Sequence, residues 1–136
     1  MKSKRVILDT NLWISFLISK KFNAIDSLIN NGDILLIFSE ESLEEFVTVA
    51  RRPKIFKYIP ESAIDEIISL FHKYGKLIKV ISNITDCRDQ KDNFLLNLAI
   101  DSNADFLVTG DSDLLILKRI KNTRILTWND FIRELK

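Results

Sequence analysis

The sequence predicts an α/β fold in three layers, with a central parallel sheet of about five strands between two layers of helices. Short apolar runs typical of strands alternate with helical patterns along the whole chain. Strands that are separated by helices run parallel and are covered on both faces. The 136 residues suit one compact domain, and no repeat, linker or shift in composition divides them. We therefore expect a single domain over residues 1–136.

Composition excludes several other classes of protein. Hydrophobic residues make up 46% of the chain and charged residues 29%, so a sizeable core can form and intrinsic disorder is excluded. Three glycines and two prolines are too few for a collagen-like or low-complexity chain. The net charge of +1 indicates no partner, so the distribution of the charges matters more than their sum.

Cysteine content and hydropathy predict a cytoplasmic protein. The single cysteine, Cys87, cannot form a disulfide within the chain or build a cysteine-based zinc site. The basic N-terminus resembles that of a signal peptide, but Asp9 interrupts the apolar run that follows it too early. The longest later apolar stretch, residues 12–18, is about a third of a membrane span. We expect a soluble protein that does not enter the membrane.

The first elements follow from apolar runs and capping residues. The apolar run at residues 5–8 predicts the first strand. Thr10 or Asn11 can cap a helix that ends near residue 20. A second helix over 23–31 is expected to stop at Gly32, because glycine tolerates positive φ.

The next strand and helix are marked at both ends. Residues 34–38 are continuously apolar, which predicts a buried strand. Ser39 can cap the helix that follows, and Glu40 and Glu41 suit the positive end of its dipole. This helix must end before Pro53.

A long amphipathic helix is expected between Pro60, which suits a first helical turn, and Gly75. Residues 77–81 alternate less clearly but are typical of a strand. Apolar residues at helical spacing predict a further helix over residues 92–102.

The last third of the chain begins with a buried strand at residues 106–108, broken by Gly110. A short helix is expected over about 112–119, and the last strand over 124–126. Thr127 can then cap a final helix.

Two acids follow strands at the edge where a parallel sheet binds ligands, and two more lie on helices that start near this edge, so all four can converge. Asp9 ends the first strand, and Asp111 follows the strand at 106–108. Asp92 begins a helix, and Glu45 lies about one turn into the helix after the second strand. Clustered carboxylates raise one another's pKa unless a cation compensates. Oxygen ligands without histidine or cysteine select Mg²⁺ or Mn²⁺, and such ions activate water in phosphodiester cleavage.

Each acid also has a plain structural interpretation. Asp9 is about as suited to capping the next helix as to binding metal, and Asp92 suits a helix N-terminus. Glu45 is typical of a solvated helix face, and Glu44 is an equal candidate by charge. Asp113 can cap the helix that follows Asp111. The joint spacing of the acids is more specific than any one of them.

Motifs along nearly the whole chain carry a resemblance to a known family. The most specific are Val-Ile-Leu-Asp-Thr-Asn at 6–11 and the stretch 86–115, which includes Val-Thr-Gly-Asp-Ser-Asp; the stretches 39–54 and 125–135 add to them. In these motifs the chain resembles the PIN-domain family of metal-dependent nucleases. Within it, the chain is similar to the VapC-like and related PIN-family toxin ribonucleases of toxin–antitoxin pairs.

The resemblance implies a PIN fold and a set of roles for matched residues. The catalytic acids match Asp9, Glu45, Asp92 and Asp111. Metal ligands match Asp9, Asp92, Asp111 and Asp113, and polar positions around them match Asn11 and Thr109. The resemblance also implies Mg²⁺ or Mn²⁺ as cofactor, a homodimer and an antitoxin partner. Trp13, Phe16 and Phe22 offer apolar surface for such association.

Basic residues form two clusters that can hold an RNA backbone: Arg51, Arg52, Lys54 and Lys57, and Lys118, Arg119, Lys121 and Arg124. Charges that complement helix dipoles are an equal explanation for Arg51 and Arg52. The sequence thus predicts a metal-dependent endoribonuclease that is the toxin of a toxin–antitoxin pair. The alternatives are a non-catalytic module that binds RNA or protein, and an RNA-processing nuclease outside such a pair.

Overall fold

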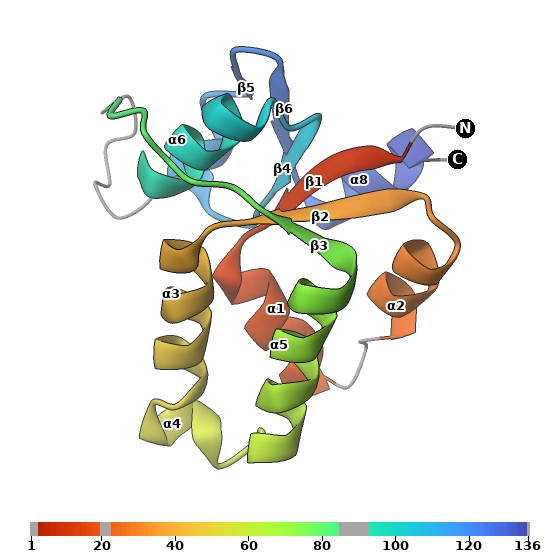
Figure 1. Ribbon diagram of the computed structural model, residues 1–136, viewed down its shortest axis with the longest axis vertical. Helices are drawn as coiled ribbons and strands as arrows, with labels where there is room; N and C mark the ends of the chain where they lie inside the picture. Colours follow the sequence, from red (N-terminus) through yellow and green to blue (C-terminus); the bar gives the residue numbers. More distant parts are fainter. Residues whose placement is uncertain (1–2, 20–22, 85–92, 136) are drawn as a thin grey trace.

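The computed structural model describes residues 3–19, 23–84 and 93–135. A six-stranded sheet forms the centre of the molecule, in the order β3-β2-β1-β4-β6-β5, and helices lie on both sides of it (Figure 1). Every strand pair is parallel except β5 with β6. The three-layer α/β prediction is therefore confirmed, with six strands in place of about five.

The elements are β1 (Lys4–Leu8), α1 (Thr10–Ser19), α2 (Asn23–Asn30), β2 (Ile34–Phe38), α3 (Glu40–Ala50), α4 (Pro53–Phe56), α5 (Glu61–Tyr74), β3 (Gly75–Leu77), α6 (Asn93–Ser102), β4 (Phe106–Val108), α7 (Ser112–Leu115), β5 (Arg119–Ile120), β6 (Thr123–Leu126) and α8 (Trp128–Leu135).

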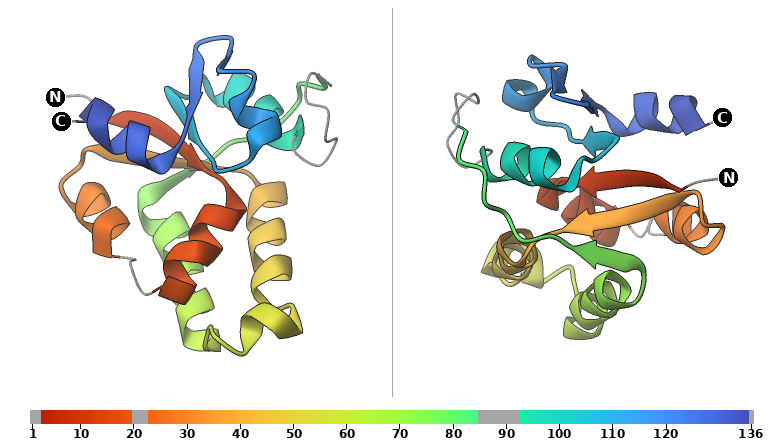
Figure 2. Two further views of the ribbon diagram at one scale, coloured as in Figure 1. Left: turned by 180° about the vertical axis from the view of Figure 1, so that it is seen from behind. Right: turned by 45° about the horizontal axis from the view of Figure 1, so that its top comes forward.

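Two hydrophobic clusters cover the two faces of the sheet. Side chains alternate between the faces along each strand, so Val6 and Leu8 belong to one cluster and Ile7 to the other. The first cluster is covered by α1, α2, α3, α5 and α8, and the second by α6 and α7. Figure 2 shows this division from two further sides. Burial of both faces explains why the strands read as nearly continuous apolar runs.

The aromatic residues of α1 belong to the first cluster. Trp13 packs edge-on against Phe71 with ring centroids 5.1 Å apart, and Phe16 packs against Trp128 at 4.9 Å. Trp13 and Phe16 are both buried in the chain itself. The prediction that they offer surface for association is therefore wrong, and Phe22 lies outside the described residues.

The predicted strand at 77–81 is displaced, because β3 begins directly where α5 ends. Gly75 allows this turn: a Cβ there would lie 2.6 Å from the carbonyl oxygen of Phe71 and 2.8 Å from the ring of Phe38. Beyond Leu77 the chain leaves the sheet and is held by Asp101 of α6, which accepts hydrogen bonds from the backbone N–H groups of Ile81 and Ser82 at 2.6 and 2.8 Å.

The predicted helix over 112–119 is also shorter than expected. The α7 helix stops at Leu115, and Lys118 then adopts a φ of 63°. This left-handed backbone is uncommon for residues other than glycine, so the sequence carried no signal for it. A tight antiparallel hairpin of β5 and β6 follows, with Lys121 at a φ of 51°. The short helix α4 was likewise not predicted.

No helix in the described ranges is long and apolar enough to cross a membrane.

Candidate active site

Asp9 lies at the carboxyl end of β1, where the neighbouring strand β4 also ends. Its backbone N–H donates to the carbonyl of Val108 at 3.0 Å, which continues the pairing of the two strands. Its carboxylate accepts a hydrogen bond from the hydroxyl of Thr109 at 2.7 Å and one from the backbone N–H of Asn11 at 3.3 Å. Only 6% of Asp9 is exposed. The sheet therefore holds this carboxylate in one orientation, turned toward the chain segment that follows β4.

The backbone of Asp111 is hydrogen-bonded to the same Thr109 hydroxyl that binds the Asp9 carboxylate. The backbone N–H of Asp111 donates to the Thr109 oxygen at 3.0 Å, so one buried hydroxyl binds the Asp9 carboxylate and the Asp111 backbone together. The Asp111 carboxylate accepts from the N–H of Asp113 at 2.8 Å and caps α7. The sequence suggested Asp113 for that capping role, and the structure gives it to Asp111.

The surroundings of Asp9 disfavour its charged form. Burial raises the pKa of Asp9 above its ordinary value, and the charge of Asp111 raises it further. The hydrogen bonds from Thr109 and Asn11 act in the opposite direction but do not cancel the effect of burial. A buried carboxylate whose charge is disfavoured, with a second carboxylate beside it, provides the kind of environment that a divalent cation stabilises.

A pocket of about 300 Å³ opens over these carboxylates, lined by Asp9, Asn11, Leu12, Gly110 and Asp111. We call it the acid pocket. Asn11 is exposed, and the group that contacts Asp9 is its backbone N–H rather than its side chain. Leu12 and Gly110 were not predicted as part of the site, although each lies within three residues of Asp9 or Asp111 in the sequence.

The chemistry of the acid pocket fits a hard cation. Its charged ligands are carboxylate oxygens, which Mg²⁺ and Mn²⁺ prefer. Within the described ranges no group of three or more histidine, cysteine or acidic side chains forms a complete metal site. Asp92, the third predicted ligand, lies outside those ranges, immediately before Asn93 of α6, and its role stays a prediction.

The other two acids lie on helices. Glu45 is half-buried on α3, whereas its neighbour Glu44 is exposed, so burial distinguishes two residues that charge does not. A hydrogen-bonded capping box between Ser39 and Ser42 fixes the start of α3 at the carboxyl end of β2. The predicted capping role of Ser39 is confirmed. Asp113 is half-buried in α7. Neither Glu45 nor Asp113 lines the acid pocket.

The two predicted basic clusters occupy different parts of the molecule. Arg51, Arg52 and Lys54 are exposed where α3 meets α4, and Arg51 forms an ion pair with Glu61. Because α3 has 11 residues and spans about 16 Å, this cluster lies far from the strand ends. Figure 1 shows α4 at the end of α3 remote from the sheet.

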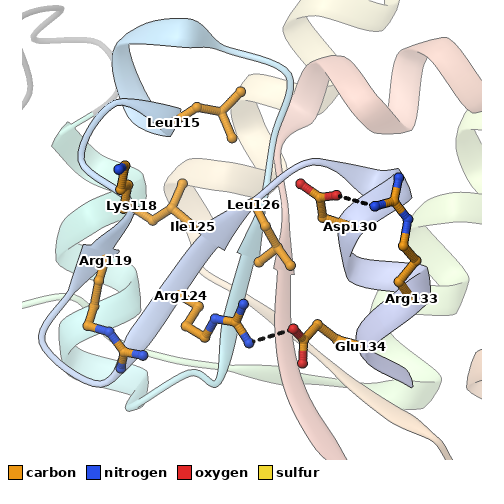
Figure 3. A pocket seen from close by; sticks show the side chains of 9 residues that line it. All are labelled: Leu115, Lys118, Arg119, Arg124, Ile125, Leu126, Asp130, Arg133 and Glu134. Carbon is orange, nitrogen blue, oxygen red and sulfur yellow. Dashed lines mark ion pairs between the residues drawn. The ribbon is translucent and has the colours of Figure 1, made fainter. Parts of the chain in front are cut away.

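Lys118 and Arg119 line a second pocket of about 650 Å³, between the β5–β6 hairpin and α8 (Figure 3). We call it the edge pocket. Its charged residues are Lys118, Arg119, Arg124, Asp130, Arg133 and Glu134.

Comparison with known proteins identifies the family. The family model of the PIN domain matches residues 5–113, a range that contains both Asp9 and Asp111. The chain belongs to the PIN-domain family. This PIN domain is 33% identical to the uncharacterized protein MJ1680 of Methanocaldococcus jannaschii, over 96% of the chain and 90% of that protein.

A solved structure shows the same fold. The PIN domain of human SMG5 superposes with a TM-score of 0.55 and 13% identity, covering 97% of this chain and 99% of that one. The predicted family is thus confirmed, and the PIN fold extends over nearly all of the chain.

Proposed function

We propose that this PIN domain is a Mg²⁺- or Mn²⁺-dependent endoribonuclease. The observation that carries the proposal is the pair of carboxylates, Asp9 and Asp111, held through the hydroxyl of Thr109 at the carboxyl ends of β1 and β4. PIN domains are typically nucleases, which agrees with such a site. RNA as the substrate rests on the resemblance to toxin ribonucleases.

In this proposal the acids divide the work. Asp9 and Asp111 would hold the cation in the acid pocket. The resemblance adds Asp92 and Asp113 as further ligands, and Glu45 would ligate the metal or orient water from α3. A bound divalent ion lowers the pKa of water and stabilises charge on a leaving oxygen. Thr109 orients both sides of the pocket, and burial of Asp9 keeps bulk water from screening its charge.

Cleavage of a labelled single-stranded RNA, measured with Mg²⁺, with Mn²⁺ and with excess chelator, tests the proposal. We expect cutting only with the metals. Asp9→Asn keeps the size of the side chain but removes its charge, so it should abolish cutting while the protein stays folded. Asp65→Asn, which removes an exposed charge on α5, is the matched control and should cut normally. Equal cleavage in chelator, or normal cleavage by Asp9→Asn, would contradict the mechanism and favour a non-catalytic binding module.

The biological role that we propose is that of a toxin in a toxin–antitoxin pair, with a homodimeric enzyme and a protein antitoxin as partner. Growth arrest on expression, relieved by Asp9→Asn and by the product of a neighbouring gene, would support this role. An enzyme that cuts RNA in vitro without affecting growth would favour RNA processing outside such a pair. Light scattering at high concentration tests the dimer separately.

A further inference from the structure

The edge pocket is linked to the acid pocket through the end of β6 and through α7, although no residue lines both pockets. The backbone N–H of Thr109, whose hydroxyl holds Asp9, donates to the carbonyl of Leu126 at 3.0 Å. Leu126 lines the edge pocket. The single-turn helix α7 also joins the two pockets, because Asp111 caps its start and Leu115 at its end lines the edge pocket. The rise over these four residues is about 6 Å.

Charge in the edge pocket is unevenly compensated. Its four cations exceed its two acids. Both acids, on α8, are already paired: Arg124 with Glu134 at 2.9 Å and Arg133 with Asp130 at 3.5 Å. Lys118 and Arg119 on the opposite wall have no ion pair among the residues that the structure describes. Figure 3 shows them across from α8, with Ile125 and Leu126 between the two walls.

The backbone that carries these two cations is firmly positioned. Lys118 holds its left-handed φ of 63° between two hydrogen bonds: its N–H donates to Leu115 at 3.1 Å, and its carbonyl accepts from Ile125 at 2.9 Å. The N–H of Arg119 donates to Leu117 at 2.7 Å. The two uncompensated charges are therefore presented from a fixed segment of the chain.

We propose that the edge pocket is a subsite for backbone phosphates of the RNA substrate, next to the phosphodiester that the acid pocket receives. Lys118 and Arg119 bind the phosphates, because they are the two cations of the pocket that no acid compensates. The inference rests on the proposed function, because it takes RNA as the substrate. RNA is favoured over an acidic peptide because Leu126 and α7 link the pocket to the carboxylate pair, where a nuclease must hold the same strand.

The test measures binding of a fluorescein-labelled octauridylate in excess chelator, so that affinity is measured without cleavage. In Lys118→Gln/Arg119→Gln the dissociation constant should rise at least about fivefold at low salt. The slope of log affinity against log salt should fall by about 1.4, since each lost contact to a single strand contributes about 0.7. Lys73→Gln/Lys76→Gln is the matched control, because it removes two exposed charges, one in the last turn of α5 and one in β3, at the opposite edge of the sheet. Its affinity and slope should equal those of the wild type.

Three outcomes decide the inference. If the wild type cuts RNA but the Lys118/Arg119 variant keeps its affinity and salt slope, the subsite is overturned while the proposed nuclease stands. If the wild type binds octauridylate through Lys118 and Arg119 but cuts no single-stranded RNA with Mg²⁺ or Mn²⁺, the nuclease proposal fails and the subsite stands. If an octaglutamate peptide binds as tightly as the RNA and loses affinity in the same variant, the pocket is an acidic-peptide site. Should the double variant melt early, Arg119→Gln alone provides the same comparison.

Discussion

The two basic regions of the molecule have similar charge but different surroundings. In the edge pocket, Lys118 and Arg119 lie in a hollow whose floor is hydrogen-bonded to Thr109 and so to the carboxylate pair. At the junction of α3 and α4, Arg51 and Arg52 project into solvent about 16 Å along a helix from the strand ends. The difference shows that the position of a basic residue relative to the sheet, and not its charge alone, decides whether it can act together with the carboxylate pair. The two basic regions and the carboxylate pair can each be altered by separate substitutions.

Among the variants that leave all the acids of the site in place, the largest effect is expected from Thr109→Val, which removes the hydroxyl shared by Asp9 and Asp111 and changes little else in shape. Loss of such an orienting contact typically costs about 10- to 100-fold in metal affinity or activity. Leaving the buried carboxylate short of a donor should also cost about 1–3 kcal/mol of unfolding free energy. Cleavage rates across a Mg²⁺ titration and chemical denaturation measure both effects.

Thr123→Val is the matched control, because Thr123 is also buried and its hydroxyl donates to the carbonyl of Ala104 at 2.6 Å, away from the acid pocket. It should lower stability and leave the metal titration unchanged. Equal kinetic losses in both variants would mean that Thr109 contributes only to the fold.

A second large effect is expected from Asp111→Asn, measured as melting temperature with chelator and with Mg²⁺. Asparagine caps helices as well as aspartate does, so the start of α7 should be preserved. Relief of the repulsion with Asp9 should leave the metal-free protein equally stable or more stable. Wild-type protein should gain about 2.7 kcal/mol at a hundredfold excess of metal over its dissociation constant, and the variant much less. A variant that loses metal-free stability but keeps the full Mg²⁺ shift would show that Asp111 serves only as a cap.

A smaller effect should appear in the pH dependence of stability without metal. Burial, aided by the charge of Asp111, raises the pKa of Asp9 in the folded protein. The folded state therefore binds a proton at Asp9 more tightly than the unfolded state does. The stability that this provides is complete below the ordinary pKa of 3.8 and is lost as pH rises through the higher folded value. Asp9→Asn should lack this loss, so its unfolding free energy relative to the wild type should increase over that range. Urea titrations of both proteins at a series of pH values measure this difference. A difference in unfolding free energy that does not change with pH would contradict the prediction.

The smallest effect is expected from Arg52→Gln/Lys54→Gln in the exposed region at the end of α3. These charges contact RNA only if the strand runs along α3 beyond the strand ends. We expect an affinity loss of about twofold for RNAs of some 15 or more nucleotides, and none for octauridylate. A loss with octauridylate as large as that of Lys118→Gln/Arg119→Gln would invalidate the contrast between the two regions.

Several elements followed directly from local sequence. The apolar runs at β2 and β4 were predicted with their observed bounds, because both strands are buried on both faces. Ser39 forms the predicted cap, and Gly32 takes a φ of 76° where a helix had to stop. By contrast, β5 has only two residues and exists because β6 pairs with it. No local pattern of two residues can predict such a strand.

The candidate site divides in the same way. Asp9 and Asp111 were predictable because an acid that follows a buried apolar strand must lie at the edge of the sheet. For Thr109, the sequence predicted only a polar residue near the acids. That one hydroxyl joins both of them depends on β1 and β4 being neighbours in register, which pairs Leu8 with Val108.

Local chemistry was sufficient for most of the helices and strands and for the placement of two acids at strand ends, because propensity, capping and burial act over a few residues. The family followed from the resemblance of sequence motifs. Which side chains meet was decided by the tertiary structure. Strand order set Asp9 beside Thr109, a left-handed Lys118 turned the chain into the β5–β6 hairpin, and packing buried Trp13 and Phe16. The physical reason is that such contacts can join residues 100 or more positions apart, as Asp9 with Thr109 and Phe16 with Trp128. Their geometry follows from the pairing of whole strands and the packing of helices on them.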